Sequence, residues 1–194
     1  MISMVHPVLL SLALLPVLSG VWLAPLPADE KPVAANDAAS TSVMLSAGTW
    51  KDIEALVARN KGKVVVVDVW STSCAPCMQE FPGLVNLHDA HPKDVICVSF
   101  NVDYVGIKNK PADFYRPRVE TFLKKQKAVF VNILCTDESD KFFASQELSS
   151  IPAVYVFGKD GKLAKRFDES LLQEGREEAF TYKADIDPFV KGLL

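Results

Sequence analysis

The feature that most constrains this fold is a short apolar run that leads directly to two cysteines. The run Val64–Trp70 reads VVVVDVW, and a short β-branched run of this kind is typical of a buried strand. Three small polar residues follow, and then come Cys74 and Cys77, three positions apart. Because positions i and i+3 share one face of a helix, we expect both sulfurs at a single helix N-terminus. There the unpaired N–H groups and the helix dipole stabilise a thiolate, so the pattern predicts a reversible dithiol/disulfide couple.

Length and composition indicate one globular domain and exclude some classes of partner. The chain has 194 residues, of which 49% are hydrophobic, and this suffices for one core. Its formal charge is −3, and it has no basic stripe or cluster of lysines and arginines. This balance argues against nucleic acid and anionic membrane surfaces as partners. We therefore expect one folded domain, and we expect it to be a monomer.

The N-terminal segment has the composition of a secretory leader. No charged residue occurs from Val8 to Leu26, and such an apolar stretch suits a signal peptide or an uncleaved anchor. The residues that follow are rich in Ala, Pro, Asp and Ser without an apolar period, which is typical of a flexible linker. We therefore expect a leader or anchor at 1–28, a linker at 29–42 and a folded domain at 43–194. The protein is then exported to a periplasmic or other extracytoplasmic space, and residues 8–26 tether it to the membrane if the leader is retained. A buried N-terminal helix is the alternative.

Hydrophobic periodicity in the folded domain predicts strands that alternate with helices. Helices are expected after the capping motif Thr49-x-x-Asp52, from the cysteines to about His88, from Pro117 to Gln126 and from Ser139 to Leu148. Strands are expected at 64–70, 95–102, 129–134, 153–158 and 163–167. The last two strands meet at Asp160-Gly161, which is a hairpin signal. This order predicts an α/β fold in which helices flank both faces of a central mixed sheet.

These residues resemble the thioredoxin superfamily and, within it, the exported TlpA-like or ResA-like thiol-disulfide oxidoreductases. The resemblance covers about 43–189. Members carry a buried Asp six residues before the first cysteine, a Trp four residues before it and a helix-kinking Pro eight residues after it. Asp68, Trp70 and Pro82 stand at those offsets from Cys74. The resemblance implies a thioredoxin-like fold with a redox-active disulfide and no other cofactor or metal.

A second matching element lies far along the chain. The sequence Ser150-Ile151-Pro152 resembles the loop in which a cis-proline faces the two cysteines. The stretch between the second core strand and this loop is longer than in plain thioredoxin, and an inserted helix and short strand there mark the TlpA-like branch. Two positions depart from the family: Ser73 replaces a Trp, and Ser99 stands where thioredoxins have a Lys near the buried Asp.

Unequal roles are expected for the two cysteines. Cys74, at the exposed helix start, would attack a partner disulfide as thiolate, and Cys77, one turn further in, would resolve the mixed disulfide. Asp68 would exchange the proton of Cys77 through water. The expected partners are protein disulfides and an upstream thiol donor. Five residues are expected to contribute to substrate binding, namely Trp70, Ala75, Pro76, Ile151 and Pro152. Packing in the core is expected to be the first role of Trp70, and substrate binding the second.

Other interpretations of the cysteines stay open at this point. A structural zinc site needs a second Cys/His pair, and neither Cys97 nor Cys135 belongs to one. Attachment of haem requires a histidine directly after the second cysteine, where Met78 stands. A peroxiredoxin-like peroxidase, with Thr72 near its reactive cysteine, and a copper-binding chaperone are the alternative functions. Cys97 and Cys135 fit best as buried apolar residues, and a disulfide between them in an exported protein is the alternative.

Overall fold

The structure is a computed structural model that describes residues 42–169 and 179–194. The chain separates into two units, 1–35 and 36–194, and all described residues belong to the second. The expected leader at 1–28 and nearly all of the expected linker at 29–42 lie outside the described residues. Within the described ranges, no helix is long and apolar enough to cross a membrane.

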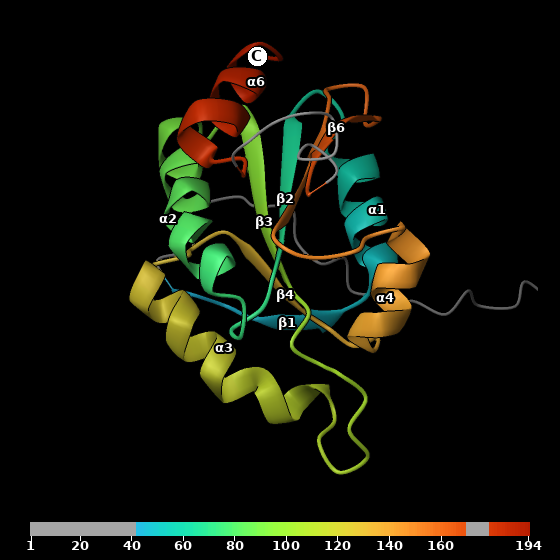
Figure 1. Cartoon of the computed structure of the whole chain (residues 1–194). Coiled ribbons are helices and arrows are strands. Elements are labelled where there is room, and N and C mark those ends of the chain that lie inside the picture. The colour runs from blue at the N-terminus through green and yellow to red at the C-terminus, as the bar shows by residue number, and fades with distance from the viewer. Residues whose placement is uncertain (1–41, 170–178) are drawn as a thin grey trace, which may run out of the picture. The chain divides into compact units, whose positions relative to one another are not determined.

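Six strands form one sheet in the order β1-β4-β3-β2-β5-β6 (Figure 1). The strands are β1 (Ser46–Gly48), β2 (Val64–Trp70), β3 (Val95–Asn101), β4 (Val131–Cys135), β5 (Ala153–Phe157) and β6 (Leu163–Phe167). The first four in spatial order are parallel, whereas β5 is antiparallel to β2 and β6 is antiparallel to β5. All seven residues of β2 and of β3 are buried, as expected for parallel strands covered on both faces. The predicted mixed sheet is confirmed.

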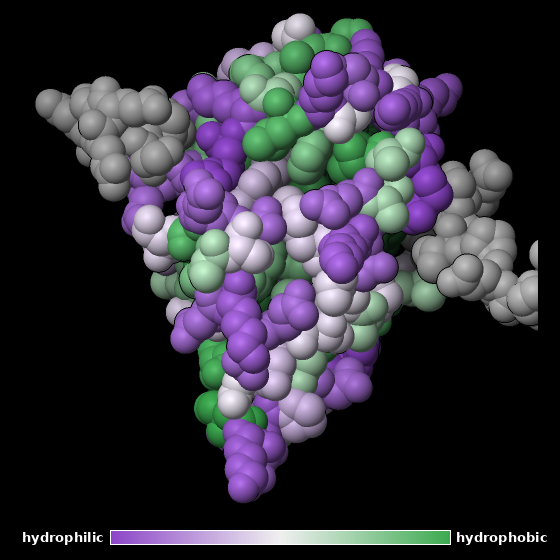
Figure 2. Space-filling view, turned by 90° about the vertical axis from the view of Figure 1, so that its right-hand side faces the viewer, coloured by the Kyte–Doolittle hydropathy of each residue, from purple (hydrophilic) through white to green (hydrophobic). Residues whose placement is uncertain are grey.

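Helices cover both faces of this sheet. They are α1 (Trp50–Arg59), α2 (Ala75–Ala90), α3 (Ala112–Gln126), α4 (Ser139–Gln146), the π-helical turn η1 (Tyr182–Ile186) and α6 (Asp187–Lys191). In Figure 1, α1 and α4 lie on one face, and α2, α3 and α6 lie on the other. Hydrophilic side chains predominate on the face drawn in Figure 2, with smaller hydrophobic areas between them.

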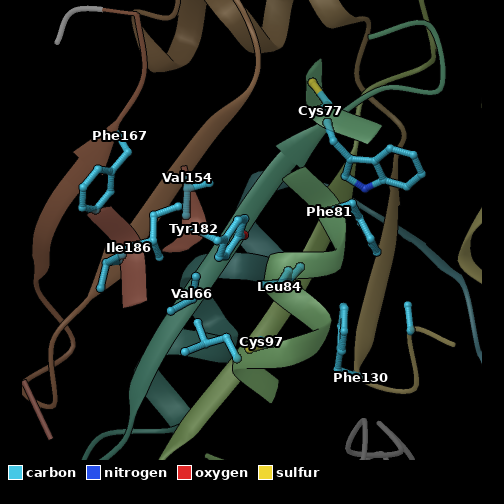
Figure 3. Packing of buried hydrophobic residues seen from close by; sticks show 14 of the residues in the cluster. Val66, Cys77, Phe81, Leu84, Cys97, Phe130, Val154, Phe167, Tyr182 and Ile186 are labelled. Atoms are coloured by element: carbon cyan, nitrogen blue, oxygen red, sulfur yellow. The ribbon is translucent and has the colours of Figure 1, made fainter. Parts of the chain in front are cut away.

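Two hydrophobic cores result, one on each face of the sheet. Alternate residues of a strand point to opposite faces, so Val64, Val66 and Trp70 enter one core while Val65 and Val67 enter the other. The first core also contains residues of α2, α3, η1 and α6. Figure 3 shows Phe81 and Leu84 of α2 with Tyr182 of η1 in this core. Asp68 has the same strand parity as Val66 and Trp70, and its side chain therefore faces the core beneath α2.

The region after β3 differs from the sequence-based expectation. Helix α3 begins at Ala112, whereas a start at Pro117 was predicted, and Pro117 lies inside it. Proline in a helix interior removes one backbone hydrogen bond. The first turn nevertheless forms, because it buries Tyr115 to 4% exposure and pairs Asp113 with Arg116 at 2.9 Å. Strand β1 was not predicted, since its three residues are too few to show an alternating pattern.

Candidate active site

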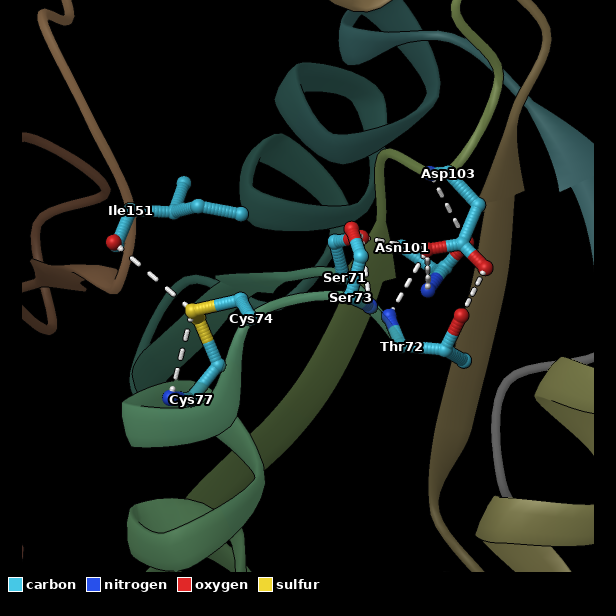
Figure 4. Close-up of a disulfide and its surroundings, with 8 residues drawn as sticks. All are labelled: Ser71, Thr72, Ser73, Cys74, Cys77, Asn101, Asp103 and Ile151. Carbon is cyan, nitrogen blue, oxygen red and sulfur yellow. Dashed lines mark hydrogen bonds between the residues drawn. A yellow bond between two sulfur atoms is a disulfide. The ribbon is translucent and has the colours of Figure 1, made fainter.

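The two cysteines of the CxxC motif form a disulfide at the start of α2. Cys74 is the N-cap residue of this helix, and its Sγ accepts a hydrogen bond from the Cys77 backbone N–H at 3.2 Å (Figure 4). The Cys74 side chain is partly exposed, whereas Cys77 is 1% exposed within the first core. The predicted position at a helix N-terminus is confirmed, and the two sulfurs differ in their access to a partner.

The loop before β5 faces the disulfide from the other side. Its Ile151–Pro152 peptide bond is cis, as the family resemblance implies, and the carbonyl oxygen of Ile151 lies 3.7 Å from the Sγ of Cys74. The loop reaches this place because β5 pairs with β2, so that Ala153 stands opposite Val69. Ala75 and Pro76 are exposed on the helix side of the same surface. The structure thus brings together four of the five residues expected to bind substrate.

Trp70 does not lie on this surface. Its side chain is 0% exposed, and its ring packs at 5.0 Å from Phe81 and 4.8 Å from Phe122, measured between ring centroids. Its indole N–H donates a hydrogen bond to the Ser99 hydroxyl at 3.2 Å. The expectation that Trp70 binds substrate is at odds with this burial, because the ring fills a gap between the sheet, α2 and α3. Trp70 holds the core beneath the disulfide.

The carboxyl group of Asp68 is buried below the start of α2. Asp68 is 2% exposed, so the predicted burial is confirmed. Its Oδ2 accepts a hydrogen bond from the Tyr182 hydroxyl at 2.8 Å, while Oδ1 has no partner among the described residues. Burial raises the pKa of Asp68 from 3.8 to about 7; the hydrogen bond from Tyr182 lowers the pKa, and the nearby charge of Glu80 raises it. A carboxyl group with such a pKa exchanges a proton near neutral pH.

A second buried carboxylate fixes the loop that precedes Cys74. One oxygen of Asp103 accepts hydrogen bonds from the Ser71 hydroxyl at 2.6 Å and the Thr72 backbone N–H at 2.7 Å. The other oxygen accepts from the Thr72 hydroxyl at 2.6 Å and from the guanidinium of Arg118 on α3 at 2.7 Å. Figure 4 shows the contacts of Asp103 with Ser71 and Thr72. The sequence analysis missed Asp103, although an acidic residue just after a predicted parallel strand is a usable signal, because the carboxyl ends of such strands meet at one edge.

Asp103→Ala is expected to destabilise the oxidised protein by about 3 kcal/mol, because it removes the buried carboxylate that accepts from the Ser71 hydroxyl and from the backbone N–H and hydroxyl of Thr72. Urea unfolding measures this loss. Asp113→Ala is the matched control, since the Asp113 side chain is 73% exposed in its pair with Arg116, and exposed pairs contribute about 0.5 kcal/mol. Equal losses in the two variants would show that Asp103 does not hold the loop.

The remaining two cysteines are free and buried, as the sequence analysis favoured. Burial raises the pKa of the Cys135 thiol to about 12 and raises that of the Cys97 thiol as well. Neither thiol is therefore a nucleophile near neutral pH. Within 42–169 and 179–194, no three His, Cys, Asp or Glu side chains are grouped so as to hold a metal ion.

Comparison with known proteins identifies the family. The sequence profile of the family described as Redoxin matches residues 34–184. The chain belongs to the Redoxin family. It is 26% identical over 106 residues to sporulation thiol-disulfide oxidoreductase A of Bacillus subtilis (strain 168), covering 55% of this chain and 59% of that protein. It is 24% identical over 129 residues to thiol-disulfide oxidoreductase ResA of Bacillus cereus, covering 66% of each. The chain thus spans about three fifths of the length of these relatives.

Solved structures support the fold of this Redoxin-family chain. A DsbF homologue from Corynebacterium diphtheriae has a TM-score of 0.52 at 22% identity, covering 71% of this chain and 76% of that one. A thiol:disulfide interchange protein of the thioredoxin family from Chlorobium tepidum TLS has a TM-score of 0.51 at 21% identity, covering 70% and 83%. The expected thioredoxin-like fold is confirmed.

Proposed function

We propose that this protein is a thiol-disulfide oxidoreductase that reduces disulfide bonds of other proteins. The observation that carries this proposal is the Cys74–Cys77 disulfide at the start of α2, with one sulfur accessible and the other buried. The names of the Bacillus relatives support the same activity. The disulfide is the only redox group that this reaction needs.

The reaction begins with the reduced dithiol. The Cys74 thiolate, stabilised by the N–H groups of the helix start, attacks one sulfur of the partner disulfide. The partner's S–S bond breaks, its other sulfur leaves as a thiolate and takes up a proton, and a mixed disulfide with Cys74 forms. Cys77 then loses its proton and attacks the Sγ of Cys74, which releases the partner's second sulfur. Two electrons pass to the partner, and the Cys74–Cys77 disulfide forms.

Asp68 is the proposed acceptor of the Cys77 proton, through water. Support comes from its burial and from its position on β2 between Val66 and Trp70, which share one core with Cys77. Its pKa of about 7 is further support, because the best general bases titrate near the working pH. The backbone at Ile151 and Pro152 is proposed to hold an extended partner segment beside Cys74, as an added strand, with Ala75 and Pro76 against its other edge.

The cellular setting belongs to the same proposal. The apolar segment at 8–26 supports export to an extracytoplasmic space, with or without a retained tether. One structural relative is described as a secreted disulfide oxidoreductase of Mycobacterium tuberculosis. In that space the oxidised protein needs an upstream thiol donor, which returns two electrons to the Cys74–Cys77 disulfide after each turnover.

Catalysis of insulin disulfide reduction, measured against peroxide consumption, tests the proposal. With dithiothreitol as the donor, we expect insulin reduction to accelerate at least about tenfold over dithiothreitol alone, and we expect no acceleration of hydrogen peroxide loss. A peroxidase would need the Thr72 hydroxyl near its reactive sulfur, whereas this hydroxyl donates to Asp103 at 2.6 Å. Peroxide consumption without insulin reduction would refute the proposed activity.

A further inference from the structure

The buried carboxyl group of Asp68 has a tyrosine hydroxyl as its hydrogen-bond partner. Ser99 is the residue paired with Asp68 across β2 and β3, and the Ser99 hydroxyl accepts the indole N–H of Trp70. The Asp68 carboxylate instead accepts a hydrogen bond from Tyr182, which lies 114 residues further along the chain. Tyr182 is itself 2% exposed.

Three contacts hold Tyr182 in this place. Its backbone N–H donates to the Glu80 carboxylate on α2 at 2.9 Å, and its hydroxyl donates to Asp68 at 2.8 Å. Its Cβ packs directly against Gly83 of α2: a Cβ added to Gly83 would lie only 2.3 Å from the Cβ of Tyr182. Glycine destabilises a helix interior, so its presence at position 83 is explained by the space that Tyr182 occupies. Helix α2 thus has a glycine at the position where Tyr182 packs closely against it.

We propose that Tyr182 is a positioning residue for Asp68: it holds the Oδ2 oxygen and leaves Oδ1 as the oxygen that takes up and releases the proton. Oδ1 has no partner among the described residues, which is consistent with this division. The inference rests on the proposed function in one respect, namely that Asp68 exchanges the proton of Cys77.

The groups around Asp68 determine in which direction its pKa shifts. Glu80 on α2 raises the pKa of Asp68, and the Tyr182 hydroxyl lowers it. Cys97 on β3 and Asp187 at the start of α6 act on Tyr182, and burial raises the pKa of its hydroxyl well above the usual value. Tyr182 therefore stays protonated and remains a donor at every pH at which Asp68 titrates. Glu80, Cys97, Asp187 and Tyr182 include no cation. Of these four groups, only the Tyr182 hydroxyl stabilises the ionised form of Asp68.

Titration of the Asp68 carboxyl carbon by NMR tests this directly in the full-length oxidised protein. The signal is assigned with Asp68→Asn, and its midpoint is compared between wild type and Tyr182→Phe. We expect the midpoint to rise by about one pH unit in Tyr182→Phe, because a hydrogen bond to the charged form is lost. Tyr115→Phe is the matched control: Tyr115 is also buried, but its hydroxyl has no partner among the described residues. An unchanged midpoint in Tyr182→Phe overturns the proposal.

The pH profile of insulin reduction provides a second readout, which a merely structural role would not move. At about pH 7 we expect turnover of Tyr182→Phe to fall about fivefold and to recover by about pH 9, because less Asp68 is ionised at neutral pH. A loss that persists at the higher pH would contradict the inference. If wild type fails to reduce insulin while the NMR midpoint still rises, the proposed function fails and the contact between Tyr182 and Asp68 stands.

A second substitution, expected to shift the Asp68 midpoint in the opposite direction, keeps the proposal testable if Tyr182→Phe does not fold. Incorporation of 3,5-difluorotyrosine at position 182 keeps the ring and makes the hydroxyl a stronger donor. The Asp68 midpoint is then expected to fall below that of wild type. A midpoint that rises or stays constant would overturn the proposal.

Discussion

Cys74→Ser is expected to lower the rate of insulin disulfide reduction at least about a thousandfold, whereas Cys77→Ser should react once and then stop. The physical reason is the difference between the two sulfurs. Cys74 is partly exposed at the helix N-terminus and Cys77 is 1% exposed beneath it. A serine hydroxyl at position 74 stays protonated at neutral pH and is a poor nucleophile for sulfur. With serine at position 77, attack by Cys74 proceeds, but the mixed disulfide has no internal thiol to resolve it.

Electrophoresis without reductant separates these outcomes. Reduced Cys77→Ser mixed with a disulfide-bonded partner should form a covalent complex that dithiothreitol releases, and Cys74→Ser should form none. Cys97→Ser is the matched control, because Cys97 is a free cysteine buried in the same core and is expected to leave turnover unchanged. Equal residual turnover in Cys74→Ser and Cys77→Ser would contradict the assignment of unequal roles. Mass spectrometry of complexes trapped by Cys77→Ser in cells would identify the natural partners.

Local patterns were sufficient for the parts of the fold that neighbouring residues determine. The apolar run of β2, the cysteines three apart and the Asp160-Gly161 turn each predict their own conformation, and the structure places a strand, a helix start and a hairpin there. Pro117 shows the limit of this approach. As a local signal it favours a helix start, but burial of Tyr115, two residues earlier, extends α3 toward its N-terminus.

The site was predictable only where its residues follow one another in the sequence or match a family motif. Cys74, Cys77 and Asp68 lie on one strand and the helix that follows it, and Pro152 matches a motif. Tyr182 meets Asp68 only because the C-terminal residues pack on α2, a tertiary contact with no local pattern. The prediction that Trp70 binds substrate was at odds with the structure for a related reason. A motif gives the position of a residue in the sequence, but it does not say whether neighbouring side chains bury that residue.

Asp68→Asn is expected to stabilise the oxidised protein at pH 8 by about 4 kcal/mol and to have little effect at pH 4. The pKa of Asp68 is about 7 in the folded protein, against an ordinary value of 3.8. Between these values the folded state holds a proton that the unfolded state has lost, so stability falls as pH rises from about 4 to 7. Above pH 7 the full penalty applies, and each pKa unit corresponds to about 1.4 kcal/mol. Asparagine keeps the shape of the side chain and cannot ionise.

Urea unfolding of the two oxidised proteins at pH 4, 6 and 8 measures this effect. Asp140→Asn, a change at an exposed carboxylate on α4, is the control and should show no comparable dependence on pH. A gain in Asp68→Asn that is the same at all three pH values would show that ionisation of Asp68 is not its cause. If the gain grows with pH while insulin reduction slows, a carboxyl group that weakens the fold at neutral pH also serves the reaction. That combination is typical of active sites, where a group is kept for its chemistry at a cost in stability.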